Sequence, residues 1–507
     1  MAGCCVARAL LLLVVAPALV GAFLSPAHGF LPRQGGGPRA RSGGISCSAA
    51  PPQAPPATTA RCPVDEENGM FECSDSVTAW GEGHMRGIAA WNPPQQQMEL
   101  VEGVAAGAHK FVQSLQRSLS TATTSRDRVY WAYHVARASF FAGLGIAGYA
   151  AAALSGRFGL VSGGGLVVNN GTSSIPNIAA NYAFRFDESL VTFEQDLKNI
   201  KKGLYKMPWD MEMGVRHQQA RPTFVATKAG QLVREASSIL QRSWRQREED
   251  KYVWFFGQDG SSEQSIYPEY YRNNFHYQTD GWMSDSSAAV YEASTETIFM
   301  GRQDCMQRTS LIPVGSWMRE KGLHKAEGKG VTALEIACGT GRFNTFLRDN
   351  WPLMDSTMSD LSPFYLSEAR KNSDYWERER RKDMPTGRAA FAQTNAEDLS
   401  QFGDASFDVV VNMYLFHELP LLARERAAKE MARVCKPGGL LVFCDSVQIG
   451  DRVGMGESMR LFTRLNEPYY ESYLDCDIPR LFTEAGLEPG EKHLSSTTKV
   501  LSFKKKE

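Results

Sequence analysis

The turn at residues 334–341 and the carboxylate of Asp360 are the groups in this sequence best suited to hold a nucleoside ligand. Gly339 and Gly341 have no Cβ, so the backbone of the turn can approach a ligand closely. Asp360 follows Gly341 by 19 residues. In a sheet of parallel strands, this spacing puts the carboxylate at the end of the next strand, where it can accept hydrogen bonds from both ribose hydroxyls. A nicotinamide dinucleotide would use the same acid, so the acid alone does not identify the ligand.

Three further features of the same region narrow the choice of ligand. The fingerprint G-x-G-x-x-G of dinucleotide-binding turns is absent, because Asn344 occupies the position of its third glycine. The segment 394–399 precedes the apolar segment 407–413 at the spacing of an adenine-binding loop before a strand. The predicted helix 421–435 is stopped by the sequence Lys-Pro-Gly-Gly at 436–439. These features disfavour a nicotinamide-dependent oxidoreductase.

Strand and helix signals alternate throughout this part of the chain. The segments predicted as strands are 331–337, 355–360, 407–413 and 440–444, and those predicted as helices are 343–348, 364–372 and 421–435. This alternation predicts an α/β fold with a doubly wound, Rossmann-like, mostly parallel sheet and helices on both faces. Ligands of such sheets bind beyond the carboxyl ends of the strands, which is where the turn and Asp360 are expected to lie.

Taken together, the order and spacing of these motifs resemble the class I S-adenosylmethionine-dependent methyltransferases, specifically the type 11 group that includes quinone- and sterol-methylating enzymes. The resemblance covers residues 331–445 by motif. We expect the methyltransferase domain to extend over residues 311–507. The resemblance implies S-adenosyl-L-methionine as the cofactor and a small molecule as the methyl acceptor.

The resemblance also implies a role for each part of the cofactor site. The turn and its preceding acid would hold the methionine part, and the second predicted strand would end in the ribose-binding acid and a residue beside the adenine. The loop at 394–399 would meet the adenine edge, and the strand at 407–413 would face the methionine end. In that order, the implied residues are Glu335, Ala337, Cys338, Gly339 and Gly341, then Asp360 and Leu361, then Asn395 and Ala396, and finally Asn412.

Two of these positions depart from the family pattern. The first glycine of the turn is Ala337 here, a small change that is compatible with binding. The acid usual at the adenine position is Asn395, whose amide oxygen can still accept a hydrogen bond.

Transfer from a sulfonium needs alignment of the acceptor and exclusion of water, and it needs a base only if the acceptor must lose a proton. His417, just past the strand at 407–413, is the first candidate for that base. The alternative interpretation makes His417 a supporting residue behind the site. His276, Tyr277 and Asp280 are weaker candidates from an upstream segment.

Two aromatic segments are candidates for binding the acceptor. The segment 268–284 combines aromatic and polar side chains, including Tyr277 and Trp282, which suit a wall over a planar, oxygen-bearing molecule. The alternative is a domain junction at 266–310 packed by aromatic residues. Tyr469, Tyr470 and Tyr473 lie in an insertion after the strand at 440–444, where this fold often builds a lid over the acceptor.

The first 64 residues contain no Asp or Glu and are predicted to be a targeting sequence. Residues 1–22 have the apolar run and small-residue cleavage site of a signal peptide, and 23–64 are rich in Arg, Ser, Pro and Gly, as a transit peptide is. This two-part arrangement resembles the plastid presequences of algae with secondary plastids. We therefore expect import into the plastid, with plain secretion as the alternative.

Residues 65–265 are predicted to form a mainly helical domain. The stretch 138–156 has no charge and is at the lower limit of length for a membrane span, so it is either a buried helix or a membrane-associated one. It contains Gly143-Leu144-Gly145-Ile146-Ala147-Gly148, a G-x-G-x-x-G match. Helix-like sequence on both sides makes this match fortuitous, since the fingerprint requires a preceding strand.

Charge and cysteine content exclude several other functions. A net charge of −1 provides no basic surface for nucleic acid, and the ten cysteines show neither a C-x-x-C pair nor zinc-ligand spacing, so no metal site is predicted. The sequence leaves the oligomeric state open. The remaining alternative to an enzyme is a non-catalytic plastid assembly or scaffold protein that keeps a degenerate methyltransferase fold.

Overall fold

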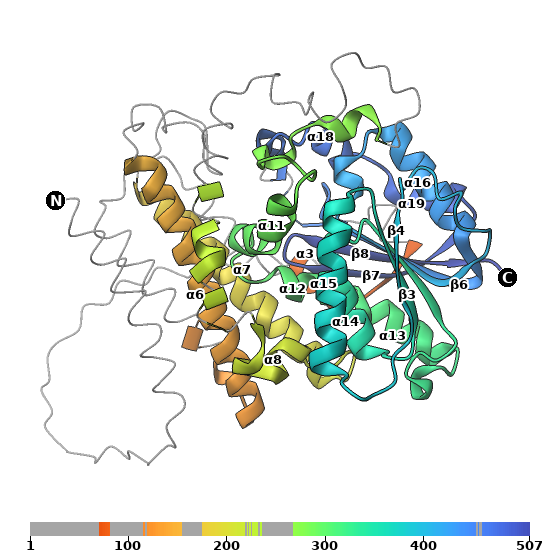
Figure 1. Cartoon of the computed structure of the whole chain (residues 1–507), viewed down its shortest axis with the longest axis horizontal. Helices are drawn as coiled ribbons and strands as arrows, with labels where there is room; N and C mark the ends of the chain where they lie inside the picture. The colour runs from red at the N-terminus through yellow and green to blue at the C-terminus, as the bar shows by residue number, and fades with distance from the viewer. Residues whose placement is uncertain are drawn as a thin grey trace, which may run out of the picture. The chain divides into compact units, whose positions relative to one another are not determined.

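The computed structural model describes residues 70–81, 119–154, 175–218, 267–452 and 459–507, and parts of 115–116, 221–235 and 455. The predicted signal and transit segments lie outside the described residues. The described residues belong to one compact unit (Figure 1). The helical region and the sheet described below therefore belong to one body.

Eight strands form one mixed sheet in the order β1-β7-β8-β6-β5-β2-β3-β4. Every neighbouring pair is parallel except β6 with β8 and β7 with β8. The predicted doubly wound, mostly parallel sheet is confirmed, with an antiparallel hairpin formed by its last two strands. The strands are β1 (Glu72–Cys73), β2 (Thr332–Ile336), β3 (Asp355–Asp360), β4 (Ala389–Gln393), β5 (Phe407–Met413), β6 (Cys435–Ser446), β7 (Leu487–Ser495) and β8 (Thr498–Lys505).

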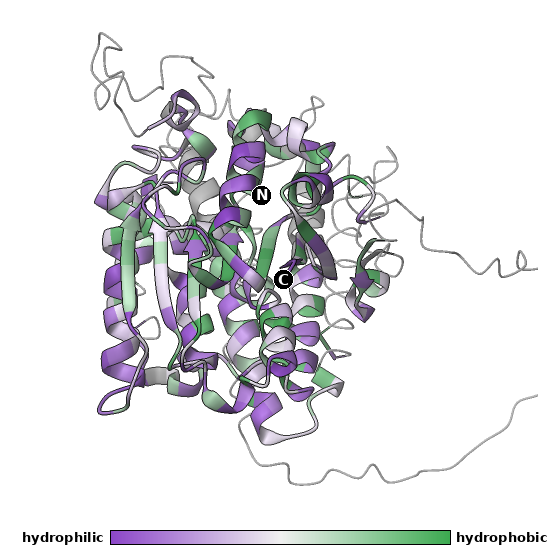
Figure 2. Cartoon of the chain, turned by 90° about the vertical axis from the view of Figure 1, so that its right-hand side faces the viewer, coloured by the Kyte–Doolittle hydropathy of each residue, from purple (hydrophilic) through white to green (hydrophobic). Residues whose placement is uncertain are grey.

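Helices cover both faces of the sheet, and they pack on it through two separate apolar clusters. The two clusters exist because successive side chains of a strand point to opposite faces. Val410 of β5 belongs to the cluster under α16 and α19, whereas Val409 and Val411 belong to the cluster under α13 and α14. Hydropathy alternates along these helices, as expected for elements with one buried side (Figure 2). Their bounds are α13 (Leu311–Glu320), α14 (Arg342–Asn350), α15 (Pro363–Arg380), α16 (Leu421–Val434) and α19 (Ile478–Glu484).

Upstream of the sheet, the chain is mainly helical, as predicted. A third apolar cluster joins α6 to α7 through Tyr130, Trp131, Phe193 and Leu197, and it reaches α12 at Cys305. The helices of this region are α3 (Asp75–Gly81), α6 (Ser125–Leu154), α7 (Ile175–Lys201), α8 (Trp209–Met213), α11 (Asp285–Ile298) and α12 (Gln303–Arg308). The remaining short elements are η2 (Gly214–Arg216), η5 (Glu269–Arg272), η6 (Phe275–Tyr277), η7 (His324–Ala326), η8 (Phe416–Glu418), η9 (Arg460–Leu465) and α18 (Tyr470–Leu474).

The charge-free stretch 138–156 lies almost entirely within α6. The G-x-G-x-x-G match at Gly143 is therefore inside a helix and has no strand before it, which confirms that it is fortuitous. Among the described helices, none combines the length and the apolar character that crossing a bilayer requires.

The helix predicted at 421–435 ends at Val434, so its stop before 436–439 is confirmed, but the strand predicted at 440–444 begins earlier than expected. Strand β6 begins at Cys435, directly after α16, and runs through all four residues. A Cβ on Gly439 would lie only 2.8 Å from the carbonyl oxygen of Lys436 and 2.9 Å from that of Asp408. Gly438 has a φ of +68°, and the register with β5 shifts between Phe407 and Val409, so the glycines are needed both for a bend in β6 and for its close approach to β5.

Candidate functional site

The turn between β2 and α14 has a left-handed backbone at three positions. The φ angles are +55° at Ala337, +54° at Gly339 and +71° at Gly341. A Cβ on Gly341 would meet the Cβ of Ala369 at 3.0 Å, so this glycine is needed for both its conformation and its space. Ala337 adopts the same conformation with a side chain, which costs free energy that glycine would not.

Asp360 ends β3 directly beside this turn. Its Oδ2 accepts a hydrogen bond from the backbone N–H of Gly339 at 2.8 Å, and its Oδ1 accepts one from the N–H of Ser362 at 2.8 Å. Burial raises the pKa of Asp360 to about 6, against the opposing effect of these N–H donors. The carboxylate is therefore fixed at the carboxyl ends of β2 and β3, where the predicted ribose site lies.

Two buried polar side chains near the turn have atoms without a protein partner. Glu335 accepts a hydrogen bond from Asn344 at 2.9 Å through Oε2, but its Oε1 has no partner. Burial raises the pKa of Glu335 to about 8. Asn412, at the end of β5, is fully buried, and neither its Oδ1 nor its Nδ2 has a partner. Orphaned buried polar atoms are costly, so a bound group with its own donors and acceptors, such as the methionine end of S-adenosylmethionine, fits this position.

The predicted adenine loop contains an internal hydrogen bond. The Oδ1 of Asn395 accepts a hydrogen bond from the N–H of Glu397 at 3.1 Å. The amide oxygen that was expected to accept a hydrogen bond from adenine therefore already accepts one within the loop. The side chain of Ala396 is partly buried against the core under α16. The hydroxyl of Tyr270 donates to Glu397 at 2.7 Å, so the upstream aromatic segment reaches this loop.

That aromatic segment packs against Leu361, the residue that follows the strand ending in Asp360. Tyr271, Met283 and Leu361, the residue predicted to lie beside adenine, form one small apolar cluster. Trp282 stacks on Phe275 with ring centroids 4.8 Å apart and an interplanar angle of 6°. Trp282, which also packs against this cluster, therefore forms part of an aromatic wall beside Leu361. The backbone of Tyr277 lies in η6, but its side chain is outside the described atoms.

The two histidines predicted as bases are both paired with carboxylates. The Nδ1 of His417 lies 2.6 Å from Asp445 Oδ1. Burial lowers the pKa of His417, but Asp445 outweighs this effect and raises it to about 9. His276 lies 3.0 Å from Glu467 and 3.5 Å from Glu418. Burial is again outweighed by the carboxylates, which raise its pKa to about 10.

Both imidazoles are therefore cations at neutral pH in this arrangement, and neither has a free lone pair to accept a proton. For His417, this environment favours the supporting role over the predicted role of base. His276 has a left-handed φ of +57°, as does Asp280 in the following turn.

The tyrosines of the insertion after β6 differ in exposure. Tyr473 is fully buried, and its hydroxyl donates to the carbonyl oxygen of Ser446. It therefore supports the end of β6 and cannot contact an acceptor without rearrangement. Tyr469 is partly exposed, and its ring meets that of Tyr270 edge-on, with centroids 6.2 Å apart. Tyr469 thus joins the insertion to the aromatic segment.

A cavity lies between the turn and the upstream helices, and most of its polar residues were missed by sequence reasoning. It is lined by Glu335, Ala337, Cys338, Gly339, Thr340, Arg342, Phe343, Met413 and Tyr414 on the sheet side, and by Arg137, Tyr291, Glu292, Thr295, Glu296, Gln303, Asp304 and Gln307 on the helical side. The missed signal is the spacing of Glu292 with Glu296 and of Gln303 with Gln307, because residues four apart share one face of a helix.

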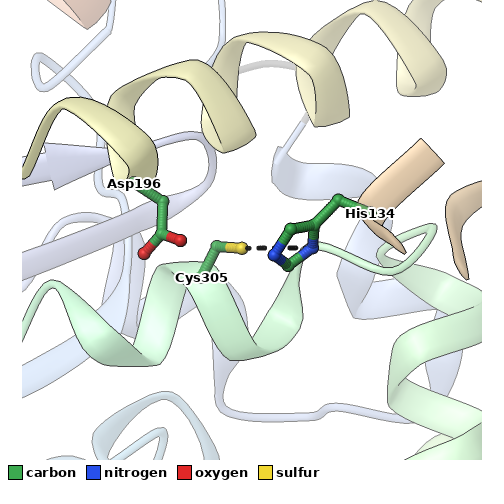
Figure 3. Close-up of side chains that lie close together, drawn as sticks. All are labelled: His134, Asp196 and Cys305. Carbon is green, nitrogen blue, oxygen red and sulfur yellow. Dashed lines mark hydrogen bonds between the residues drawn. The ribbon is translucent and has the colours of Figure 1, made fainter. Parts of the chain in front are cut away.

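His134, Asp196 and Cys305 come together in the helical region with ligand atoms within 4.8 Å of one another (Figure 3). However, Asp196 is already bound by both donor arms of Arg308, at 3.1 and 2.7 Å. The guanidinium of Arg308 donates to both carboxylate oxygens of Asp196, and its positive charge would repel a metal cation. The cluster is therefore explained as a buried ion pair that fastens α12 to α7.

Residues 334–443 match the family model described as a methyltransferase domain. O-methyltransferase cnsE of Penicillium expansum is 29% identical over 142 residues, which cover 28% of this chain and 47% of the relative. The 2-methyl-6-phytyl-1,4-hydroquinone methyltransferase of Synechocystis is 33% identical over 123 residues, which cover 24% of this chain and 34% of the relative. The chain thus spans less than half the length of these curated relatives. A solved structure of the CurJ carbon methyltransferase is 13% identical and covers 80% of this chain and 99% of its own, with a TM-score of 0.36.

Proposed function

We propose that this chain, whose C-terminal part is a class I S-adenosylmethionine-dependent methyltransferase domain, methylates a small apolar or aromatic acceptor in the plastid. The acceptors considered are a quinone, a prenyl phenol, a sterol-like molecule and a pigment. The observation that carries the proposal is the position of Asp360, held against the left-handed turn by the N–H of Gly339 at 2.8 Å.

The residues around the turn fit the cofactor in chemical terms. Asp360 offers a carboxylate to the ribose, and Glu335 and Asn412 offer buried polar atoms that lack protein partners. When bound, S-adenosylmethionine supplies an activated methyl group on a sulfonium. The protein has to orient an acceptor toward that methyl group and keep water away.

The choice of acceptor is supported by the aromatic walls and by one relative. Tyr271 and Trp282 of the upstream segment, together with Tyr469 of the insertion, provide flat apolar surfaces with polar tips. Such side chains suit a ring that carries oxygen atoms. The similarity to a hydroquinone methyltransferase points to the same class. The acid-free residues 1–64 support the plastid as the location.

A direct test incubates the full-length protein with methyl-labelled S-adenosylmethionine and lipid extracts of plastids. We expect label to enter a small apolar product. In a strain that lacks the protein, metabolite profiling should show loss of that product and accumulation of a species 14 mass units lighter, which is one methyl group replacing hydrogen. A scaffold role would be indicated instead if S-adenosylmethionine neither protected the protein against heat nor gave a labelled product.

A further inference from the structure

The cavity beside the turn is lined by acceptor atoms that lack donors. Four of its oxygens are buried without a hydrogen-bond partner: Glu296 Oε2, Gln303 Oε1, Gln307 Oε1 and Glu335 Oε1. Three of them come from α11 and α12, which precede the matched methyltransferase segment at 334–443. A ligand that satisfies all four must be rich in N–H or O–H donors.

Glu296 is the most informative of these groups. It is 2% exposed, and only its Oε1 is used, accepting from Arg137 at 2.9 Å and from the N–H of Asp304 at 3.3 Å. An ion pair with Arg137 therefore accounts for one oxygen and leaves the other facing no donor. Burial raises the pKa of Glu296 to about 7, even though Arg137 opposes this shift. The carboxylate is thus short of positive charge.

The charges around the cavity favour a cationic group. Four acidic side chains line it, Glu292, Glu296, Asp304 and Glu335, against two basic ones, Arg137 and Arg342. Both arginines share Asp304, with Arg342 at 2.7 Å and Arg137 at 3.1 Å. An ammonium group brings both the missing positive charge and three donors. The two guanidinium groups suit a carboxylate attached to the same ligand.

We propose that α11 and α12 complete the donor site by binding the α-amino acid end of the nucleoside cofactor, with Glu296 accepting from its ammonium group. This inference rests on the proposed function, because it assumes that the turn holds S-adenosylmethionine. It gives the helical region a part in cofactor binding that lies outside the methyltransferase motif. The binding site for the amino acid end is then formed by both the helical region and the sheet.

The test compares two nucleosides by calorimetry on the full-length protein. S-adenosylhomocysteine carries the amino acid end, and 5′-methylthioadenosine lacks it. For Glu296→Gln, we expect the Kd of S-adenosylhomocysteine to rise about tenfold, with the Kd of methylthioadenosine unchanged. Gln303→Met removes a neutral acceptor from the same cavity, and we expect a smaller loss, again confined to S-adenosylhomocysteine.

Glu188→Gln provides the matched control. Glu188 is also 2% exposed and bound to an arginine, Arg452 at 3.0 Å, but it does not line the cavity. This variant should bind both nucleosides like the wild type. The inference is overturned if Glu296→Gln binds S-adenosylhomocysteine with wild-type affinity, or if it loses both nucleosides equally. A wild-type protein that binds neither nucleoside would instead remove the proposed function itself.

Discussion

Ala337 illustrates, at the scale of the residue, what the cofactor turn demands of its backbone. Its φ of +55° lies in the left-handed region, next to two glycines with similar angles. For a residue with a Cβ, this conformation costs roughly 1–2 kcal/mol. The family pattern has glycine here, so the chain carries a strained residue within its most informative motif.

Ala337→Gly should stabilise the protein. Glycine removes the left-handed strain but increases the entropy of the unfolded chain by about 0.5–1 kcal/mol, which leaves a net gain on the order of 0.5–1 kcal/mol. Urea unfolding measures this change directly. Gly341→Ala is the opposite control, because its new Cβ would meet Ala369 at 3.0 Å and should destabilise the turn. A lower stability of Ala337→Gly would show that the methyl group of Ala337 contributes more than the strain costs.

At the scale of the element, β1 and α3 act as a strap across the edge of the sheet. Phe71 packs edge-on against Phe503 of β8 at 5.4 Å, and Trp80 is 3% exposed. The indole N–H of Trp80 donates to Gln195 of α7 at 2.6 Å, and Arg452 lies over its ring at 4.7 Å. A short segment thus joins the sheet, the helical region and the loop after β6.

Trp80→Ala should lower the free energy of unfolding by about 3–5 kcal/mol, because it leaves a large cavity and removes the indole donor of Gln195 Oε1. Chemical denaturation of the full-length protein provides the measurement. Trp80→Phe keeps most of the volume and should lose less than half as much. If Trp80→Ala lost under 1 kcal/mol, the segment 70–81 would not be a structural strap.

The sequence predicted the sheet elements that carry periodic apolar patterns, and it missed those defined by distant contacts. The bounds of β5 agree with prediction because it is a short apolar run. Those of β3 also agree, but its only apolar residue is Met358, and the spacing of Asp360 from the turn predicted it instead. The strand at 440–444 was predicted too short because Gly438 and Gly439 indicate a turn locally, whereas the pairing of Cys435 with Phe407 that extends the strand depends on a distant residue. Strand β1 has two residues, too few to show any period.

The same limit applies to the candidate site. Asp360 and the turn follow from spacing along the chain, and the structure brings them into contact. The role of His417 could not be settled from sequence, because its partner Asp445 is 28 residues away, at the end of the next strand. Glu296 went unnoticed because acids on a helix are usually solvated, and only the fold shows that this one is buried.

At the scale of the whole molecule, the helical region and the sheet share buried charges that link stability to pH. The pKa of Glu335 is raised to about 8, that of His417 to about 9 and that of His276 to about 10. All three folded-state values lie above the ordinary ones of 4.5 or 6.5. Folding therefore retains protons that the unfolded chain releases.

Stability should consequently fall as the pH rises from 7 to 9. The two protonated histidines stabilise the fold fully below pH 6.5, and this stabilisation is lost as the pH rises through their folded-state pKa values. The free-energy cost of burying Glu335 grows as the pH rises to about 8, its folded-state pKa. Each titrating group contributes up to about 1.4 kcal/mol per pH unit. Urea unfolding at pH 7, 8 and 9 measures how the free energy of unfolding changes with pH. Glu335→Gln should make this change smaller between pH 7 and pH 8. Constant or rising stability over this range would contradict the assigned protonation states.

The central claim is that the turn and Asp360 bind the methyl donor, and calorimetry of Asp360→Ala with S-adenosylhomocysteine tests it most directly. Removing a carboxylate that accepts two ribose hydrogen bonds, each worth about 1.5–3 kcal/mol, should weaken binding by at least about 100-fold. The fold should survive, because only the two hydrogen bonds from the N–H groups of Gly339 and Ser362 are lost at the end of a strand, and a single cooperative unfolding transition would confirm this. A folded Asp360→Ala protein with wild-type affinity would contradict the account.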